Sequence, residues 1–476
     1  MSGPASKASL ANALPIPRSQ RTWGGWIAAA VAATAGVASW SFVVGGYTAY
    51  YVGAREGTAT MLAGALFGQF LVSLSQLPAV TRYGIETLNT TKPQLGVRGA
   101  VFSLIVQYAT LIGWNLVLLI FLGRAMASVL AAVGLITDAA MPQAATICSL
   151  VALVLIWLAL QRGTAAVRIL GAILAVVILV LGLTMYGFLF SHYTLAEIAA
   201  APPIAPLPEG RLMNYMMGFE LLLVSTLSWW AYMGAMFRMV DGVSKSIIPS
   251  MGSLGFGWAA AGLIGLYSAL AAGEADPTIW MRELGGPVGG IIVLLFVACA
   301  NVGSITVGVH AAALGFGQLS PRTQRLGWNS LLLSALVPMT AVLLVFPGPF
   351  YDNVGTFLAI IGVTLAPMIG IQIADFFVLR RIDSLHLPSL YRYDARSRYW
   401  YAKGYSPAGI IALLAGSLTY IAVLDPLTFV PNTGLFQYTG ATIPAALIGA
   451  VVYLIGMRLT AARWQGAEGP GDTGEG

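Results

Sequence analysis

Long runs of apolar residues dominate the chain from about Trp26 to Leu459, and short clusters of charged residues, prolines and glycines separate them. A helix needs roughly 20 apolar residues to cross a hydrocarbon layer about 30 Å thick. Counting the runs on that basis predicts about twelve transmembrane helices, centred near residues 36, 68, 112, 152, 178, 225, 260, 300, 336, 364, 414 and 449. The pattern therefore predicts an all-α polytopic membrane protein.

The charge distribution predicts the orientation of these helices. Only 9% of the 476 residues are charged, and the net charge is +6. An even number of helices places both termini on one side, and only four of the 24 Lys and Arg residues fall on the other side: Arg55, Arg124, Arg211 and Arg282. The positive-inside rule then predicts cytoplasmic termini. We expect the membrane to be a bacterial-type inner membrane. The basic excess indicates contact with an anionic lipid surface and gives no reason to expect a nucleic-acid partner.

The composition of both ends of the chain predicts tails outside the transmembrane domain. Residues 1–22 are polar, basic and proline-containing and lack a convincing signal cleavage site, so they predict an N-terminal cytoplasmic tail. Residues 461–476 become Gly-rich and acidic, which predicts a C-terminal cytoplasmic tail. The transmembrane domain is expected over residues 23–460.

Several function classes find no support in the sequence. It contains no Walker A loop, dinucleotide-binding glycine motif or HExxH motif, and its three histidines are scattered. The two cysteines, Cys148 and Cys299, lie inside predicted helices, so neither a disulfide framework nor a cysteine metal site is expected. We therefore expect no cofactor and no enzyme. A channel, a secondary transporter and, remotely, a membrane-embedded enzyme remain, although carboxylates are nearly absent from mid-helix positions.

Two predicted helices carry glycines and hydroxyls at mid-membrane depth. Residues 34–46 of the first helix and 225–234 of the sixth mix small, hydroxyl and aromatic residues. Small residues more often mark close helix packing. However, discontinuous helices at matching positions in two halves of a chain are typical of transporter substrate sites. We therefore expect both helices to be interrupted, near 36–41 and 228–234.

Aromatic residues at similar depth suggest how a ligand is held. Trp114 in the third helix and Trp229 or Trp230 in the sixth fall well inside their helices, not at the interfacial belt where tryptophan is enriched. Two tryptophans at the same membrane depth predict that their indole rings stack on the two faces of a flat heterocycle. His310 in the eighth helix is interpreted as a structural residue in preference to a proton relay.

Charged residues within the helices give a second hypothesis. Arg124 and Glu220 each lie about 14 Å outward of the nearby tryptophan, by helix rise. They are expected either to pair in an outer vestibule or to reach the headgroups independently.

Several motifs, in order and spacing, resemble one family. These are Arg82-Tyr83-Gly84-Ile85, Gly96-Val97-Arg98-Gly99, Trp114, the segment 366–381 (APMIGIQIADFFVLRR), Leu390-Tyr391, the segment 399–406 (YWYAKGYS) and Ile443-Pro444-Ala445-Ala446. Together they resemble the nucleobase–cation symporters, the family of purine, cytosine, uracil, allantoin and hydantoin permeases. The resemblance covers most of residues 24–460.

The resemblance implies a leucine-transporter-type fold, with inverted repeats of helices one to five and six to ten followed by two more helices. Substrate would lie between helices one, three, six and eight. The stacking tryptophans of the family fall on Trp114 and Trp229, with Trp230 as the alternative. Ser228 precedes the second tryptophan, and Ala38 marks the break in helix one.

The chain departs from the family pattern at the positions that read the substrate and bind the cation. Leu118 stands where members often have Gln, and Ile305 where they have Asn, with Asn301 one turn earlier. The sodium site would use carbonyls near Thr34 and Val37. Its two helix-eight hydroxyls are replaced by Cys299 and Ala300, and a hard cation prefers oxygen ligands.

These departures favour proton coupling, with Glu220 as the best intramembrane carboxylate and Arg124 as its possible partner. The sequence thus predicts import of a nucleobase or related small planar N-heterocycle by proton symport through alternating access. A transporter of the same fold for another solute, such as a vitamin precursor or an amino acid, is the alternative.

Overall fold

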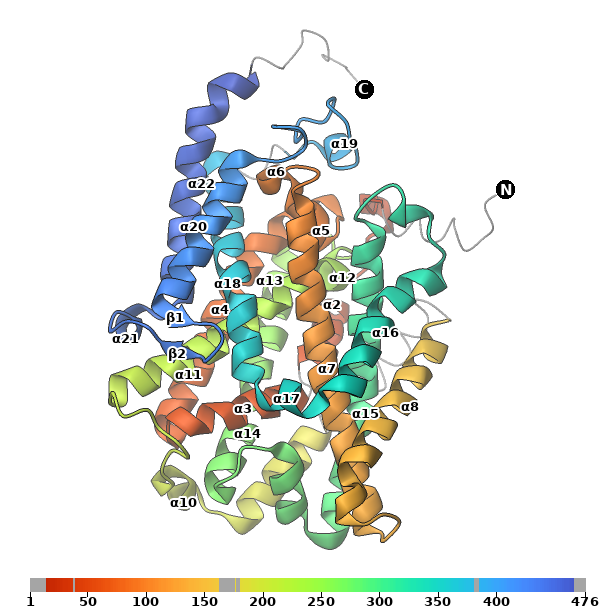
Figure 1. The fold of residues 1–476 in the computed structure, drawn as a ribbon, viewed down its shortest axis with the longest axis vertical. Coiled ribbons are helices and arrows are strands. Elements are labelled where there is room, and N and C mark those ends of the chain that lie inside the picture. Colours follow the sequence, from red (N-terminus) through yellow and green to blue (C-terminus); the bar gives the residue numbers. More distant parts are fainter. Residues whose placement is uncertain (1–13, 37–38, 162–175, 177–179, 381–384, 466–476) are drawn as a thin grey trace.

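The computed structural model describes residues 14–36, 39–161, 176, 180–380 and 385–465. The described chain is almost entirely helical (Figure 1). Its first part contains η1 (Arg18–Gln20), α2 (Gly25–Gly36), α3 (Ser39–Tyr51), α4 (Ala54–Tyr83), α5 (Thr87–Thr90), α6 (Lys92–Leu95), α7 (Ala100–Ala132), η2 (Asp138–Ala140), α8 (Met141–Leu160), an apolar helix Val180–His192 and α10 (Leu195–Ala200).

The second part starts with the elements equivalent to predicted helices six to eight: α11 (Arg211–Leu227), η3 (Ser228–Tyr232), α12 (Met233–Phe237), η4 (Val243–Lys245), α13 (Ile247–Pro249), η5 (Ser250–Gly257), α14 (Trp258–Ala272) and α15 (Pro277–Gly317). It continues with η6 (Thr323–Arg325), α16 (Trp328–Val345), α17 (Pro347–Asp352), α18 (Val354–Ile373), η7 (Ala374–Leu379), α19 (Leu387–Leu390), α20 (Pro407–Val423), the antiparallel strands β1 (Leu424–Asp425) and β2 (Val430–Pro431), α21 (Phe436–Thr439) and α22 (Thr442–Gln465).

The helices agree with the predicted apolar runs. Among the described residues, eight helices are long and apolar enough to cross a membrane, and the bent pair α2 and α3 makes a ninth candidate. The predicted centres at 225 and 414 fall in the shorter helices α11 and α20, while the centre at 178 lies outside the described residues. The long helix α15 is broken at Gly286, whose φ of 62° is a conformation that glycine readily adopts, so its membrane-spanning part begins at Val288.

Close helix approach depends on small residues. A Cβ on Gly45 of α3 would lie 2.0 Å from the Gly262 carbonyl oxygen of α14, and one on Gly265 would lie 2.2 Å from the Phe42 oxygen. Small residues allow membrane helices to approach backbone to backbone. This contact holds the second half of helix one against helix seven.

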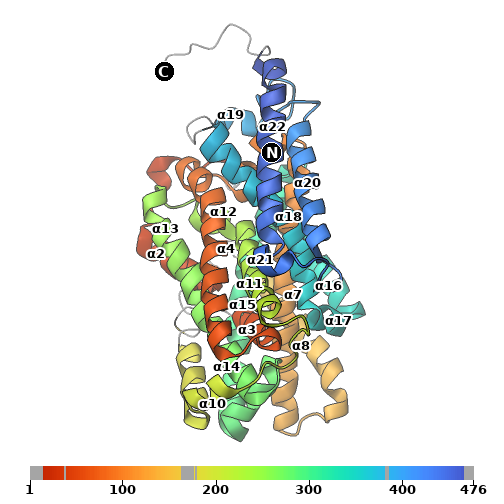
Figure 2. The same ribbon diagram turned by 90° about the vertical axis from the view of Figure 1, so that its left-hand side faces the viewer.

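The described chain begins and ends at the same end of the bundle. The Ile16 amide donates to the Gly84 carbonyl at the end of α4 (3.0 Å), beside α5. The last residues of α22 also lie at this end, with α6 and α19, whereas α10 lies at the opposite end (Figure 2). We call these the α19 end and the α10 end.

Candidate substrate site

Helix six is interrupted as the sequence predicts. The α-helix α11 ends at Leu227, residues Ser228–Tyr232 form a 3-10 turn, and α12 follows. A 3-10 turn is wound more tightly than an α-helix, so residues Ser228–Tyr232 point in other directions than a continuous α-helix would give them. In helix one, α2 and α3 are bent by 54°. The predicted site residue Ala38 and the predicted cation residue Val37 lie outside the described residues.

A small cavity of about 10 Å³ adjoins the interruption in helix six. Its wall is formed by seven residues from helices one, three, six and seven: Trp40, Trp114, Ser225, Ser228, Trp229, Tyr232 and Trp258. Trp114 and Trp229 therefore both lie on the wall of one cavity, and their role in binding a ligand stays a prediction. The alternative residue Trp230 faces α18 instead, because its Nε1 donates to Gln372 Oε1 at 2.6 Å.

Trp40 is the main wall residue that sequence reasoning missed. Its ring makes T-shaped contacts with Trp114 (centroids 5.6 Å apart) and with Trp229 (5.2 Å). Trp229 also packs against Tyr232 (5.4 Å). The two predicted stacking rings are therefore joined by a third indole in this structure. Trp40 lies in the segment that predicted a broken helix one, which was the available signal, whereas Trp258 of α14 had none.

Three other predicted substrate residues lie near these helices but are absent from the described cavity wall. Asn301 accepts a hydrogen bond from Ser39 Oγ (2.5 Å), and its Nδ2 donates to the Leu118 carbonyl (3.2 Å). Asn301 thereby links α15 to α3 and α7. Leu118 and Ile305 are fully buried.

The described residues of the predicted cation site supply few oxygen ligands. Thr34 is buried, and its hydroxyl donates to the Ala30 carbonyl at 2.8 Å. Ala300 is buried and has no side-chain oxygen, whereas Cys299 is exposed. The Cys299 side chain therefore lies on the surface of the described structure, whereas the Ala300 side chain lies in its interior.

The predicted pair of Arg124 with Glu220 is wrong, because each residue has other partners. Arg124 forms ion pairs with Asp276 (3.1 Å) and Asp352 (3.0 Å), and its guanidinium lies 4.3 Å from the centre of the Tyr351 ring. Spacing along helices three and six placed both residues at similar depth but could not reveal these two carboxylates, one after α14 and one at the last residue of α17.

Glu220 instead joins helix six to the C-terminal helices. One carboxylate oxygen, Oε1, accepts from the Thr442 amide (2.9 Å) and the Thr442 hydroxyl (2.7 Å) at the start of α22. The other, Oε2, has no hydrogen-bond partner among the described residues. Glu220 therefore caps α22, where the amide groups at a helix N-terminus favour a negative charge.

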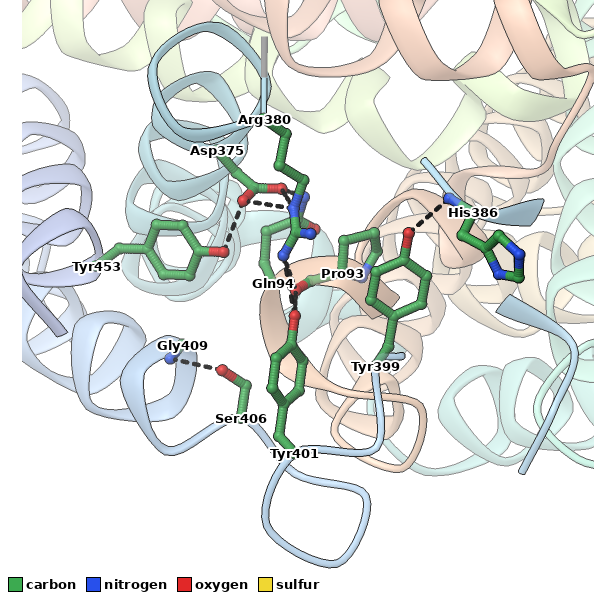
Figure 3. Close-up of polar contacts among 10 residues, drawn as sticks. All are labelled: Pro93, Gln94, Asp375, Arg380, His386, Tyr399, Tyr401, Ser406, Gly409 and Tyr453. Atoms are coloured by element: carbon green, nitrogen blue, oxygen red, sulfur yellow. Dashed lines mark hydrogen bonds and ion pairs between the residues drawn. The ribbon is translucent and has the colours of Figure 1, made fainter. Parts of the chain in front are cut away.

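A polar network closes the α19 end of the bundle (Figure 3). Buried Asp375 of η7 accepts hydrogen bonds from Gln94 (2.6 Å), Tyr453 (2.7 Å) and Arg380 (2.9 Å). Arg380 also donates to the Pro93 carbonyl (3.0 Å). The late motif that carried the family resemblance thus connects η7 to α6 and α22.

Three further buried charged residues lie at this end. Arg238 after α12 lies 3.5 Å from the Glu86 carboxylate before α5. Burial raises the pKa of the Glu86 carboxyl, and the charge of Arg238 lowers it in part. Lys92 donates to the Leu390 carbonyl (2.6 Å) and to the Tyr393 hydroxyl (3.1 Å), and burial lowers its pKa to about 7.

Comparison with known proteins agrees with this arrangement. The family model described as permease for cytosine/purines, uracil, thiamine and allantoin matches residues 15–456. Two solved structures of Mhp1, a nucleobase-cation-symport-1 family transporter, share the fold. The closed conformation with bromovinylhydantoin bound has a TM-score of 0.77 and 17% identity, and the match covers 95% of this chain and 96% of that chain. The inward-facing conformation has a TM-score of 0.78 and 17% identity, and the match covers 94% of this chain and 93% of that chain. A Na⁺-coupled sialic acid symporter is more distant (TM-score 0.57, 12% identity, 96% of both chains).

One curated relative, the purine-uracil permease NCS1 of Arabidopsis thaliana, is 23% identical over 192 residues. That match covers 38% of this chain and only 31% of the relative. The family whose model matches consists of permeases, so the chain is a multi-pass membrane transporter and not an enzyme. The chain belongs to the nucleobase–cation symporter family.

Proposed function

We propose that this transporter imports a nucleobase or a related small planar N-heterocycle together with protons, by alternating access. The observation that carries the proposal is the cavity at the interruption of helix six, where Trp114, Ser228 and Trp229 meet. Aromatic faces suit a flat π ligand, and offset or edge contacts between rings add about 0.5–1.5 kcal/mol beyond area burial.

The cavity must widen before it can hold a ring. Its volume of about 10 Å³ is close to the minimum that holds one water molecule, so we propose that the surrounding side chains, Trp40 among them, move when a heterocycle binds. The bound ligand in the Mhp1 structure is a substituted hydantoin, which is also a planar N-heterocycle.

Proton coupling is proposed from the chemistry of the chain. Ala300 has no side-chain oxygen to offer a cation, and the side chain of Cys299 offers a thiol, whereas Na⁺ as a hard cation is held by oxygen ligands. Glu220 is a buried carboxylate without a basic partner among the described residues, and ionised carboxylates are costly to bury unpaired. We assign it as the residue that takes up and releases the proton.

We further propose a bacterial inner membrane location with the α19 end facing the cytoplasm. Tails at residues 1–22 and 461–476 would then flank a transmembrane domain over 23–460. In alternating access, one helix bundle rocks against the other around a fixed site. The polar network of Asp375 and the Glu86–Arg238 pair would keep the α19 end closed between release events.

Uptake by purified protein in liposomes tests the proposal. Radiolabelled uracil, cytosine, allantoin and hydantoin are supplied with either an inward proton gradient or an inward sodium gradient. We expect at least one heterocycle to accumulate with the proton gradient and choline outside, and Glu220→Gln to abolish that accumulation while binding persists. Strict sodium dependence would contradict proton coupling, and uptake of amino acids but no heterocycle would favour the alternative solute class.

A further inference from the structure

A surface pocket lies between the first turns of α4 and α11 and shares no residue with the cavity beside Trp114. It has a volume of about 630 Å³ and is lined by Arg55, Glu56, Ala59, Arg211, Leu212 and Tyr215. Because α4 ends at the α19 end, its first turn lies toward the α10 end (Figure 2). Arg55 and Arg211 are two of the four basic residues that the sequence predicts on that side of the membrane.

The charged residues of this pocket leave a positive excess. Arg211 forms an ion pair with Glu56, whereas Arg55 has no ion-pair partner among the described residues. Glu209 precedes Arg211 by two residues but does not line the pocket. Arginine suits phosphate groups, because its planar guanidinium presents several donors in a fixed geometry. The pocket therefore fits a phosphate group, and its acidic residue is already paired.

An apolar stripe continues from the pocket along α4. Every fourth residue from the pocket inward is exposed and lies on one face of the helix: Arg55, Ala59, Ala63 and Phe67. By helix rise, Phe67 lies about 18 Å from Arg55 along the helix axis, which is close to half of a hydrocarbon layer about 30 Å thick. The stripe therefore has about the length of one leaflet of a bilayer.

Helix α11 forms the other wall of the stripe. Leu212 is exposed, and Tyr215 and Phe219 are partly exposed. The Phe219 ring stacks on the Phe67 ring (centroids 6.4 Å apart), which joins the two walls at their inner end. We call the pocket and this stripe together the α4–α11 groove. The groove is basic at the α10 end and apolar along its length, as a phospholipid is charged at its headgroup and apolar along its chains.

We propose that the α4–α11 groove binds an anionic phospholipid, with the phosphate at Arg55 and Arg211 and an acyl chain along the apolar stripe of α4. Basic pockets between transmembrane helices bind anionic lipid headgroups by the same attraction. The ammonium group of a zwitterionic lipid would find no free carboxylate on the pocket wall, because Glu56 is paired. A bound lipid touches both α4 and α11, so it stabilises the folded protein.

Thermal unfolding of the purified full-length protein in a neutral detergent tests the proposal. The midpoint is measured against increasing concentrations of phosphatidylglycerol, which is anionic, of phosphatidylcholine, which is zwitterionic, and of sodium phosphate. A ligand that binds the folded state raises the midpoint, so each titration gives an apparent affinity. We expect phosphatidylglycerol to raise the midpoint at concentrations at which the other two leave it unchanged. Equal stabilisation by phosphatidylcholine or by sodium phosphate, or none by phosphatidylglycerol, would overturn the proposal.

Two variants place the effect in the groove. Arg55→Gln removes the unpaired charge and is expected to weaken the affinity for phosphatidylglycerol about fivefold. Its matched control is Arg282→Gln, which removes an exposed arginine from the wall of another pocket and should leave the affinity unchanged. Ala63→Phe fills the groove without changing its charge and is expected to lower the affinity. Its control, Ala30→Phe, adds the same bulk at an exposed position of α2.

The thermal midpoint without lipid reports the folding of each variant. Equal losses of affinity in Arg55→Gln and Arg282→Gln would indicate general attraction of the lipid to basic residues and would overturn the proposal. Unchanged affinity in both Arg55→Gln and Ala63→Phe would overturn it as well.

Discussion

At the scale of single residues, the wall of the cavity consists mainly of aromatic side chains. The sequence predicted some of these residues as site residues and missed others. Trp114 and Trp229 followed from depth in their helices and from the family motif. Trp40 was visible in the sequence, but its ring contacts with both of them depend on the bend between α2 and α3.

Replacing Trp229 by leucine tests the stacking role. The change removes a flat aromatic face and keeps an apolar side chain, so we expect heterocycle binding to weaken about three- to tenfold or more. Trp157→Leu is a suitable control, because the Trp157 indole donates to Asn329 (2.8 Å) away from the cavity. Equilibrium binding measures both variants, and equal affinities for the two would refute the stacking role.

The second residue-scale prediction concerns Lys92 and pH. Because burial lowers the pKa of Lys92 to about 7, the unfolded chain holds this proton between about pH 7 and 10.5 while the folded protein has released it. Stability therefore rises with pH in this window, by at most about 1.4 kcal/mol per pH unit for one proton. We expect Lys92→Met to reduce the slope of unfolding free energy against pH, and the exposed Lys245→Met to leave it unchanged. The same slope in wild-type protein and Lys92→Met would contradict this.

At the scale of elements, the apolar runs predicted where helices lie, and glycines with hydroxyls predicted where helix six breaks. Charge partners were harder to foresee. Arg124 and Asp276 are 152 residues apart, and Arg124 and Asp352 are 228 apart, so only the packed structure brings them together. The same holds for Glu220 and Thr442, which are 222 residues apart.

The second half of helix six is held by a buried ion pair. The Gly234 amide of α12 donates to Thr87 Oγ1 (2.8 Å), and Arg238 lies 3.5 Å from Glu86. Removing one partner of a buried pair leaves an uncompensated charge, which costs about 3–5 kcal/mol. We expect Glu86→Gln to lower the unfolding free energy by this order, and the double variant Glu86→Gln/Arg238→Met to cost less than the sum of the single changes.

The matched control for this cycle is the exposed pair of Arg396 and Asp394 (2.9 Å), where Arg396→Met should change stability by less than about 1 kcal/mol. Additive effects of the two Glu86 and Arg238 changes would show that these side chains do not act as a pair.

At the scale of the whole molecule, the first and last described residues and the α5, α6 and α19 segments share one end. The sequence predicted a shared side from the even number of predicted helices. It could not predict how the late segment around Asp375 packs on Gln94, because that contact joins residues 281 positions apart.

Cysteine labelling in intact cells tests the orientation. In a background with Cys148→Ala and Cys299→Ala, a cysteine in the segment after α19 (Arg398→Cys) should resist a membrane-impermeant maleimide. A cysteine at the first residue of α11, which follows α10 in the chain (Arg211→Cys), should react. Permeabilised cells provide the control, in which both positions react. The reverse pattern in intact cells would contradict the proposed topology.

The central claim is that the substrate lies in the cavity between Trp114 and Trp229. The most direct measurement is a cryo-EM structure of the protein saturated with the heterocycle that stabilises it most. The account predicts density for a planar ring in contact with both indoles and within hydrogen-bond reach of Ser228 or Tyr232. Ligand density elsewhere in the protein, and none between Trp114 and Trp229, would contradict it.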